Sequence, residues 1–175
     1  MGWDQLDVGV ELPFDPSIAI PELHEVALDL PTAEPVPDVE ATARASVLAT
    51  LAPAVRAGMT VAVGAGSRGL TNRVELLRGT IAGLRELGAE PFVVPAMGSH
   101  GGARAEGQQA MLAHLGIDEA SIGAEIRATM ETEIVATTAD GMSLHLDRHA
   151  AAADRILPVN RVKPHTCFKG PIESG

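Results

Sequence analysis

The segment Thr60–Asn72, with the sequence TVAVGAGSRGLTN, decides the fold that we expect for this chain. A short apolar run at residues 61–63 leads into three glycines, and a helical pattern follows. This order is typical of a buried β-strand, a tight loop with exposed backbone N–H groups and the N-terminus of a helix. Such a corner binds anions, because the helix dipole and the unpaired N–H groups both favour negative charge. We therefore predict a phosphate- or carboxylate-binding corner that uses Arg68.

The spacing of the three glycines leaves other interpretations open. Gly64, Gly66 and Gly69 match the G-x-G-x-x-G fingerprint of dinucleotide binding. That fingerprint expects an acidic residue about 20 residues further on, at the end of the next strand. Here the next apolar run, residues 91–94, continues into PAMGSH without an acid. An NAD(P)-binding Rossmann dehydrogenase-like domain stays an alternative, as does a non-catalytic fragment that binds an anion or a loop whose glycines only permit a turn.

Apolar runs and helical patterns alternate through most of the chain. We expect strands at residues 59–63, 91–94 and 155–159, and these imply right-handed crossovers and a parallel sheet. The expected helices cover residues 39–56, 72–87 and 104–115, followed by a short helix at 118–122 and a strand at 125–129. The predicted fold is α/β, with a Rossmann-like parallel core sheet flanked by helices.

Two additions to this core follow from the sequence. Residues 1–35 are expected to be a β-rich N-terminal segment, because residues 8–13 and 18–29 alternate weakly between prolines. Residues 36–175 would form the Rossmann-like catalytic domain. Within it, strands at 133–138 and 142–146 are predicted to form an added hairpin through the turn Ala139-Asp140-Gly141.

Composition limits the classes of partner. The chain has 175 residues, of which 46% are hydrophobic and 2% aromatic, and its net charge is −10. The negative charge and the scarcity of aromatic stacking platforms argue against nucleic acid and anionic membranes as partners. The single cysteine fits a reducing compartment, the N-terminus does not resemble a signal peptide, and no apolar run approaches the ~20 residues of a membrane span. We expect a cytoplasmic protein.

Candidate catalytic residues follow three of the expected strands. In an open parallel sheet, ligands bind beyond the carboxyl ends of the strands, and the loops there carry Arg68, His100 and His165. Histidine titrates near neutrality, and arginine can hold a carboxylate by two hydrogen bonds. These three residues therefore predict acid/base chemistry on a small anionic substrate. The single cysteine excludes a C-x-x-C pair, and we expect no metal ligands within this chain.

Three motifs in order carry a family resemblance: GAGSRGLTN at residues 64–72, PAMGSHGG at 95–102 and VNRVKPHTCFKGPIESG at 159–175. The chain resembles the N-terminal part of the nickel-dependent lactate racemase family and its uncharacterised relatives. In that family an arginine of the first loop binds the substrate carboxylate, and histidines of the second and third loops flank the substrate carbon. The resemblance gives these roles to Arg68, His100 and His165.

The resemblance also implies a cofactor, a pincer nucleotide that carries nickel and accepts a hydride. Ser67 and Thr71 would lie near its phosphate, and we assign Lys163 of the third, basic loop to cofactor binding as well. The family's cofactor-bearing lysine and its nickel-ligating histidine follow the third motif, so we expect both in a C-terminal remainder of the same protein.

The function that we expect is therefore that of an isomerase, a racemase or epimerase of a small 2-hydroxy acid. It would act by reversible hydride transfer to the nickel pincer nucleotide, and this chain would hold the N-terminal half of the site. The isolated chain is expected to be inactive. Because the SRGL and KPH loops are more similar to the uncharacterised relatives than to lactate racemase itself, the resemblance indicates a substrate class and no particular acid.

Overall fold

A computed structural model describes residues 22–27, 34–67, 69–167 and 169–171. By its internal contacts the chain divides into two units, Met1–Glu34 and Pro35–Gly175. In the first unit, residues 22–27 have no regular secondary structure, and Leu23 and Val26 are 92% and 73% exposed. The predicted strand at 18–29 is therefore wrong for residues 22–27, because weak alternation forms a strand only where one face is buried. The rest of the predicted β-rich segment lies outside the described residues.

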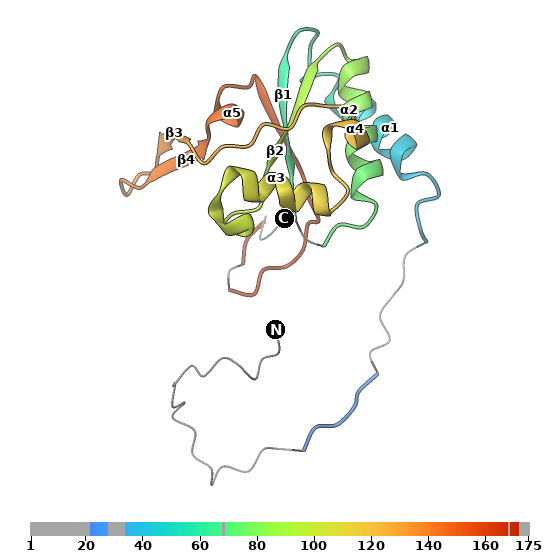
Figure 1. The fold of residues 1–175 in the computed structure, drawn as a ribbon, viewed down its shortest axis with the longest axis vertical. Helices are drawn as coiled ribbons and strands as arrows, with labels where there is room; N and C mark the ends of the chain where they lie inside the picture. Colours follow the sequence, from blue (N-terminus) through green and yellow to red (C-terminus); the bar gives the residue numbers. More distant parts are fainter. Residues whose placement is uncertain (1–21, 28–33, 68, 168, 172–175) are drawn as a thin grey trace. The chain divides into compact units, whose positions relative to one another are not determined.

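The second unit is built on a parallel sheet of three strands in the order β2-β1-β5 (Figure 1). The strands are β1 (Thr60–Ala65), β2 (Glu90–Pro95) and β5 (Arg155–Val159). Val63 of the central strand is in register with Val93 on one side and Leu157 on the other. The predicted α/β class, with a parallel sheet made from these three runs, is confirmed.

Four helices connect and cover the strands: α1 (Val39–Leu51), α2 (Arg73–Glu86), α3 (Ala105–His114) and α4 (Glu119–Ile122). Asp38 begins α1 by accepting a hydrogen bond from the N–H of Ala41 at 2.9 Å. The helix ends at Leu51 and not near Arg56 as predicted, because Pro53 has no N–H to donate to a helical carbonyl.

Both faces of the sheet are covered. On one face, alternate residues of β1 (Val61, Val63 and Ala65) lie in the main hydrophobic cluster together with side chains from α2, α3 and α4. On the other face, Ala62 lies in a smaller cluster to which α5 (Arg148–Ala151) contributes the buried Ala150. Figure 1 accordingly shows α1, α2 and α4 on one side of the sheet and α5 on the other. The central strand is thereby buried almost throughout.

The predicted hairpin is confirmed as β3 (Thr132–Thr137) and β4 (Ser143–Asp147), paired antiparallel with a bulge between Ile134 and Ala136. It extends away from the core sheet in Figure 1, and all of β3 is exposed. The strand predicted at 125–129 is reduced to one parallel bridge, between Ile126 and Val93. None of the helices in the described ranges has the length and apolar character that crossing a bilayer requires.

Candidate functional site

The first predicted loop leaves the carboxyl end of β1 and reaches α2 at Arg73. Asn72 adopts a left-handed conformation there, with φ 51°, and Gly69 has φ 68°. These two residues turn the chain from the strand into the helix, and glycine and asparagine tolerate that conformation best. Arg68, the predicted carboxylate ligand, lies outside the described residues, so its role stays a prediction.

The second predicted loop follows β2 and is held against the first. The N–H of Ala96 donates to the carbonyl of Ala65 at 2.8 Å, and the buried amide of Gln108 donates to the carbonyl of Gly98 at 2.8 Å. A 3₁₀ turn, η2 (His100–Ala103), comes next where the sequence indicated only a loop. Backbone and side-chain hydrogen bonds thus fix the position from which His100 projects.

The two loops meet at a hydrogen bond between the hydroxyl of Ser67 and Nδ1 of His100. Both residues are half-buried, and 33 positions separate them in the chain. The sequence placed them at the same edge of the sheet, as the ends of two neighbouring parallel strands. It did not indicate that their side chains would touch, because periodicity gives the position of a loop and not the direction of its side chains.

A cavity of about 470 Å³ opens beside Ser67 at the carboxyl edge of the sheet. It is bounded by the ends of all three core strands, as expected for a ligand site in an open parallel sheet. Two of its side chains, Arg161 and Lys163, are cationic. Its lining residues are Gly64, Gly66, Ser67, Gly69, Leu70, Ala96, Pro158, Val159, Asn160, Arg161 and Lys163. The predicted residues Ser67 and Lys163 therefore line one cavity. His100 does not line it and is connected to it by its hydrogen bond with Ser67.

A second cavity, of about 700 Å³, lies at the N-terminus of α2 and shares Arg161 with the first. Thr71, which the resemblance places near a phosphate, lines this second cavity together with Arg73. Nε of Arg73 donates to the carbonyl of Leu70 at 3.0 Å, whereas its Nη1 is buried without a hydrogen-bond partner among the described residues. The positive end of the α2 dipole favours an anion at this position, whereas the buried Nη1 of Arg73 is not accessible from the cavity.

The third predicted loop carries His165, which is half-buried. Its Nδ1 accepts a hydrogen bond from the backbone N–H of Cys167 at 3.0 Å. An imidazole nitrogen that accepts a hydrogen bond carries no proton, so a neutral His165 has its proton on Nε2. His165 does not line the cavity that Ser67 and Lys163 border.

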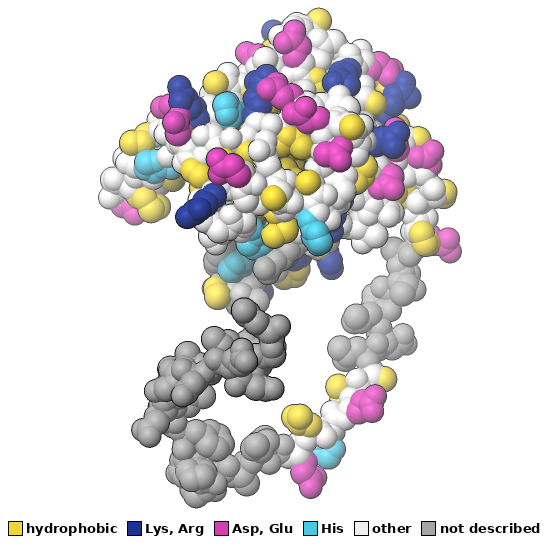
Figure 2. Space-filling view, viewed as in Figure 1, with side chains coloured by type: hydrophobic (Ala, Val, Ile, Leu, Met, Phe, Trp, Pro, Cys, Tyr) yellow, Lys and Arg dark blue, Asp and Glu magenta, His cyan; other side chains and the backbone are white. Residues whose placement is uncertain are grey.

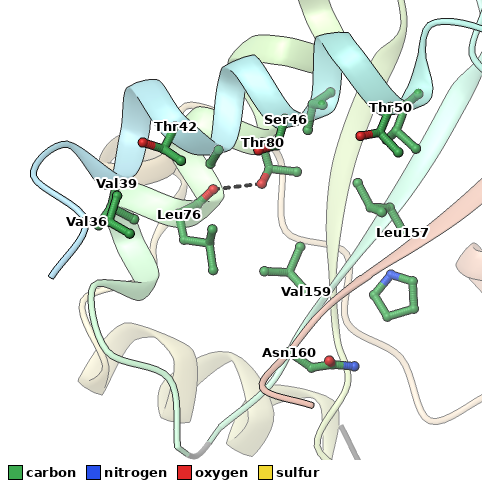
Figure 3. Close-up of a pocket in the computed structure, with 14 residues that line it drawn as sticks. Val36, Val39, Thr42, Ser46, Thr50, Leu76, Thr80, Leu157, Val159 and Asn160 are labelled. Carbon is green, nitrogen blue, oxygen red and sulfur yellow. Dashed lines mark hydrogen bonds between the residues drawn. The ribbon is translucent and has the colours of Figure 1, made fainter. Parts of the chain in front are cut away.

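Figure 3 shows a different hollow, of about 450 Å³, between α1, α2 and β5. Leu76, Leu157 and Val159 form apolar parts of its wall, and the hydroxyls of Thr42, Ser46 and Thr50 come from successive turns of α1 (Figure 3). None of its lining residues is titratable. This hollow, which the sequence did not indicate, supplies no acid, base or charged group for catalysis.

Among the residues that the structure describes, charged groups elsewhere do not form a second candidate site. The pKa values of Glu125, Asp140 and Asp154 lie below their ordinary values, chiefly because of hydrogen bonds from Arg127, Thr138 and Thr60 respectively, and none of these carboxyls lines the cavity beside Ser67. Figure 2 shows acidic and basic side chains interspersed over the visible face of the folded unit. Within the described ranges, no three His, Cys, Asp or Glu side chains come together as a potential metal site.

Comparison with known proteins adds no family assignment. Neither the protein-family models, nor the curated proteins, nor the solved structures that were searched contain a match to this chain. The functional assignment therefore depends on the three motifs and on the geometry at the carboxyl edge of the sheet.

Proposed function

We propose that this chain holds the N-terminal half of the active site of a racemase or epimerase of small 2-hydroxy acids. The observation that carries the proposal is the hydrogen bond between Ser67 and His100 beside a cavity that Lys163 also lines. The first two motifs meet in that contact, and the third supplies the cationic wall. Three motifs far apart in the sequence thus contribute to one place at the edge of the parallel sheet.

The charges and hydrogen-bonding groups suit an anionic substrate. Arg161 and Lys163 give the cavity a positive wall in a chain whose net charge is −10. A carboxylate of the substrate would bind there, with Arg68 as its predicted bidentate partner. His100 would hold or release the proton of the 2-hydroxyl group, since imidazole exchanges protons near neutral pH. His165 would act on the opposite side of the same carbon.

The residues present fit the phosphate part of the nickel pincer nucleotide that the resemblance implies. Ser67 and Lys163 would hold it in the first cavity, and Thr71 would lie in the second cavity, which shares Arg161 with the first. When bound, the nucleotide supplies a nickel-activated centre that takes up the C2 hydrogen together with its electron pair. Its anchoring lysine and nickel ligand would come from the C-terminal remainder of the full-length protein.

The alternative of an NAD(P)-dependent dehydrogenase rests on Gly64, Gly66 and Gly69. All three glycines line the cavity beside Ser67. Such a site needs an acid at the carboxyl end of the second strand for the ribose hydroxyls. The acid of β2 is Glu90, which is in register with Thr60 at the opposite end of the sheet. NADH titration separates the two functions: binding at micromolar concentration favours the dehydrogenase.

The racemase is tested with full-length protein produced together with the enzymes that make the cofactor. A panel of single-enantiomer 2-hydroxy acids, each deuterated at C2, is incubated and analysed by chiral chromatography and mass spectrometry. We expect the opposite enantiomer or epimer to form with the deuterium retained, because hydride transfer does not release it to water. The variant His100→Ala should lose the activity, and Arg148→Ala, in an ion pair with Glu131, serves as the control. Absence of interconversion across the panel, or loss of deuterium to solvent, contradicts the proposal.

A further inference from the structure

We propose that Ser67 is a positioning residue whose hydroxyl oxygen accepts a hydrogen bond from Nδ1–H of His100. The backbone amide of Cys167 donates to Nδ1 of His165 and so fixes the proton of that ring on Nε2. The two histidines therefore have unequal roles. The inference on the tautomers follows from two separate contacts, Ser67 Oγ with His100 Nδ1 and Cys167 N with His165 Nδ1. Its catalytic consequence rests on the proposed function.

The direction of the bond between Ser67 and His100 follows from the chemistry of the cavity. Ser67 lines a space whose other polar side chains include the cations Arg161 and Lys163, so the ligand expected there is an anion. The unprotonated oxygens of a carboxylate or phosphate group only accept hydrogen bonds, and the hydroxyl of Ser67 would therefore donate its single hydrogen bond to such an oxygen. The same oxygen then accepts a hydrogen bond from the N–H at Nδ1 of His100, because a hydroxyl has two acceptor lone pairs.

This arrangement leaves Nε2 of His100 as its proton-accepting atom. When the substrate hydroxyl releases its proton, the O–H bond breaks and an N–H bond forms at Nε2 of His100. The C2 hydrogen and its electron pair would leave to the hydride acceptor that the proposed function requires. His100 becomes an imidazolium, which still donates from Nδ1 to Ser67. The contact thus persists in both protonation states, and no side chain has to rotate during the transfer.

His165 has the opposite arrangement. A backbone N–H always donates, so Nδ1 of His165 must accept, and the ring can present only an N–H group at Nε2. His165 does not line the cavity beside Ser67 in this conformation, and a substrate oxygen that reached its Nε2 would meet a hydrogen-bond donor. The ring can take up a proton only if the contact with Cys167 opens, since both of its nitrogens are otherwise occupied.

Nitrogen-15 NMR of the chain with labelled histidine tests the tautomers without cofactor or substrate. At a pH where the rings are neutral, in inorganic phosphate buffer as the anion probe, we expect the proton of His100 on Nδ1 and that of His165 on Nε2. His100→Gln and His165→Gln assign their signals among the six histidines. In Ser67→Ala, His100 should lose its preference for Nδ1–H whereas His165 keeps its own tautomer, and Ser67→Thr, which retains the hydroxyl, should restore it.

The proposal is overturned by a proton on Nε2 of His100, or on Nδ1 of His165, in the unmodified chain; this measurement does not depend on whether a variant folds. An unchanged His100 tautomer in a folded Ser67→Ala chain overturns it as well.

In the full-length enzyme, Ser67→Ala should lower kcat by about 10- to 100-fold with a smaller change in KM, as expected for a misplaced base. His165→Gln, which keeps an N–H donor, should be far more active than His165→Ala; equal activities of these two contradict the donor role. A full-length enzyme with the expected tautomers and no interconversion would contradict the proposed function and leave the tautomer assignment standing.

Discussion

Gly107, in the first turn of α3, lies directly against the carbonyl oxygen of Gly101, so that a Cβ atom at position 107 would overlap that oxygen. Gly101 belongs to the turn that carries His100 and has φ 65°. The absence of two side chains therefore lets α3 pack closely against the turn that carries His100. The position of His100 depends on a helix that contributes no group to the cavity beside Ser67.

We expect Gly107→Ala to displace this turn and to weaken the contact between His100 and Ser67. Overpacking costs typically about 1–3 kcal/mol, and this loss opposes the gain of about 1 kcal/mol that alanine brings to a helix interior. Urea unfolding measures the net stability, and the histidine NMR spectrum reports the contact. Ala113→Ser, at an exposed position of the same helix, is the control. A stabilised Gly107→Ala chain with an unchanged His100 signal would contradict this prediction.

The packing of α1 on α2 has a similar cause and predicts an order of two effects. A Cβ at Gly79 would overlap the backbone carbonyl of Glu40, whereas a Cβ at Gly83 would lie 2.8 Å from Cβ of Val47. The overlap is smaller at Gly83, because the nearest atom to a Cβ there is at 2.8 Å, whereas at Gly79 the carbonyl oxygen of Glu40 is at 2.1 Å. Gly79→Ala should therefore destabilise more than Gly83→Ala, with losses on the order of 1–3 kcal/mol in urea unfolding. The reverse order, or a gain in the free energy of unfolding at both positions, would contradict this prediction.

The sequence predicted the sheet well because its strands are short apolar runs bounded by glycine and proline. The run at 61–63 is apolar on both faces, as is typical of a central parallel strand. The strands β1 and β2 continue through Gly64 and Pro95, and their loops begin just after Ala65 and Pro95. The parallel crossovers then require the loops to share one edge. The region of the site, although not its internal geometry, follows from these rules.

The sequence did not predict the contacts that individual loop side chains make. Periodicity indicated neither the bond from Ser67 to His100 nor the one from the amide of Cys167 to His165, because loop side chains take their directions from tertiary packing. The end of α1 was misplaced by five residues although Pro53 was visible. Leucine and valine keep helical spacing beyond Leu51, but α1 ends there because Pro53 has no N–H to donate to a helical carbonyl.

Asp154 links β5 to the start of β1 and predicts a dependence of stability on acid. Its carboxylate accepts hydrogen bonds from the N–H and the hydroxyl of Thr60, at 2.8 and 2.9 Å, and these bonds lower its pKa. A carboxyl whose pKa is lower in the folded state stabilises the fold above its unfolded pKa, and this contribution is lost as the pH falls through the folded pKa. Asp154→Asn should lower Tm at neutral pH and reduce the change in Tm between neutral and acidic pH. Parallel Tm profiles of the two chains would contradict this reading.

The hairpin should be the least protected regular structure in the described part of the chain. The apolar side chains of Ile134, Val135 and Leu144 are 61%, 52% and 41% exposed, and a two-stranded ribbon is marginal without a packed face. Its amides should exchange with deuterium through local opening, much faster than those of β1, which open only with the whole fold. Hydrogen exchange read by mass spectrometry compares residues 132–147 with residues 60–65. Equal protection of the two segments would mean that something covers the hairpin in solution.

Arg161 lines both cavities at the carboxyl edge of the sheet and should make the largest single contribution of the described residues to anion binding. Its planar guanidinium can bind a carboxylate or a phosphate through two parallel hydrogen bonds, which lysine cannot reproduce. We expect Arg161→Ala to weaken the binding of inorganic phosphate and of lactate about tenfold, equivalent to ~1.4 kcal/mol, and Arg161→Lys to recover only part of this loss.

Calorimetric titration of the chain at low ionic strength measures both affinities, and added salt should weaken them because the site is open to solvent. Arg148→Ala removes a cation that is paired with Glu131, away from the cavities, and controls for the change in net charge. If Arg148→Ala weakens phosphate binding as much as Arg161→Ala does, the anion is held by the overall charge of the protein and not by this edge of the sheet.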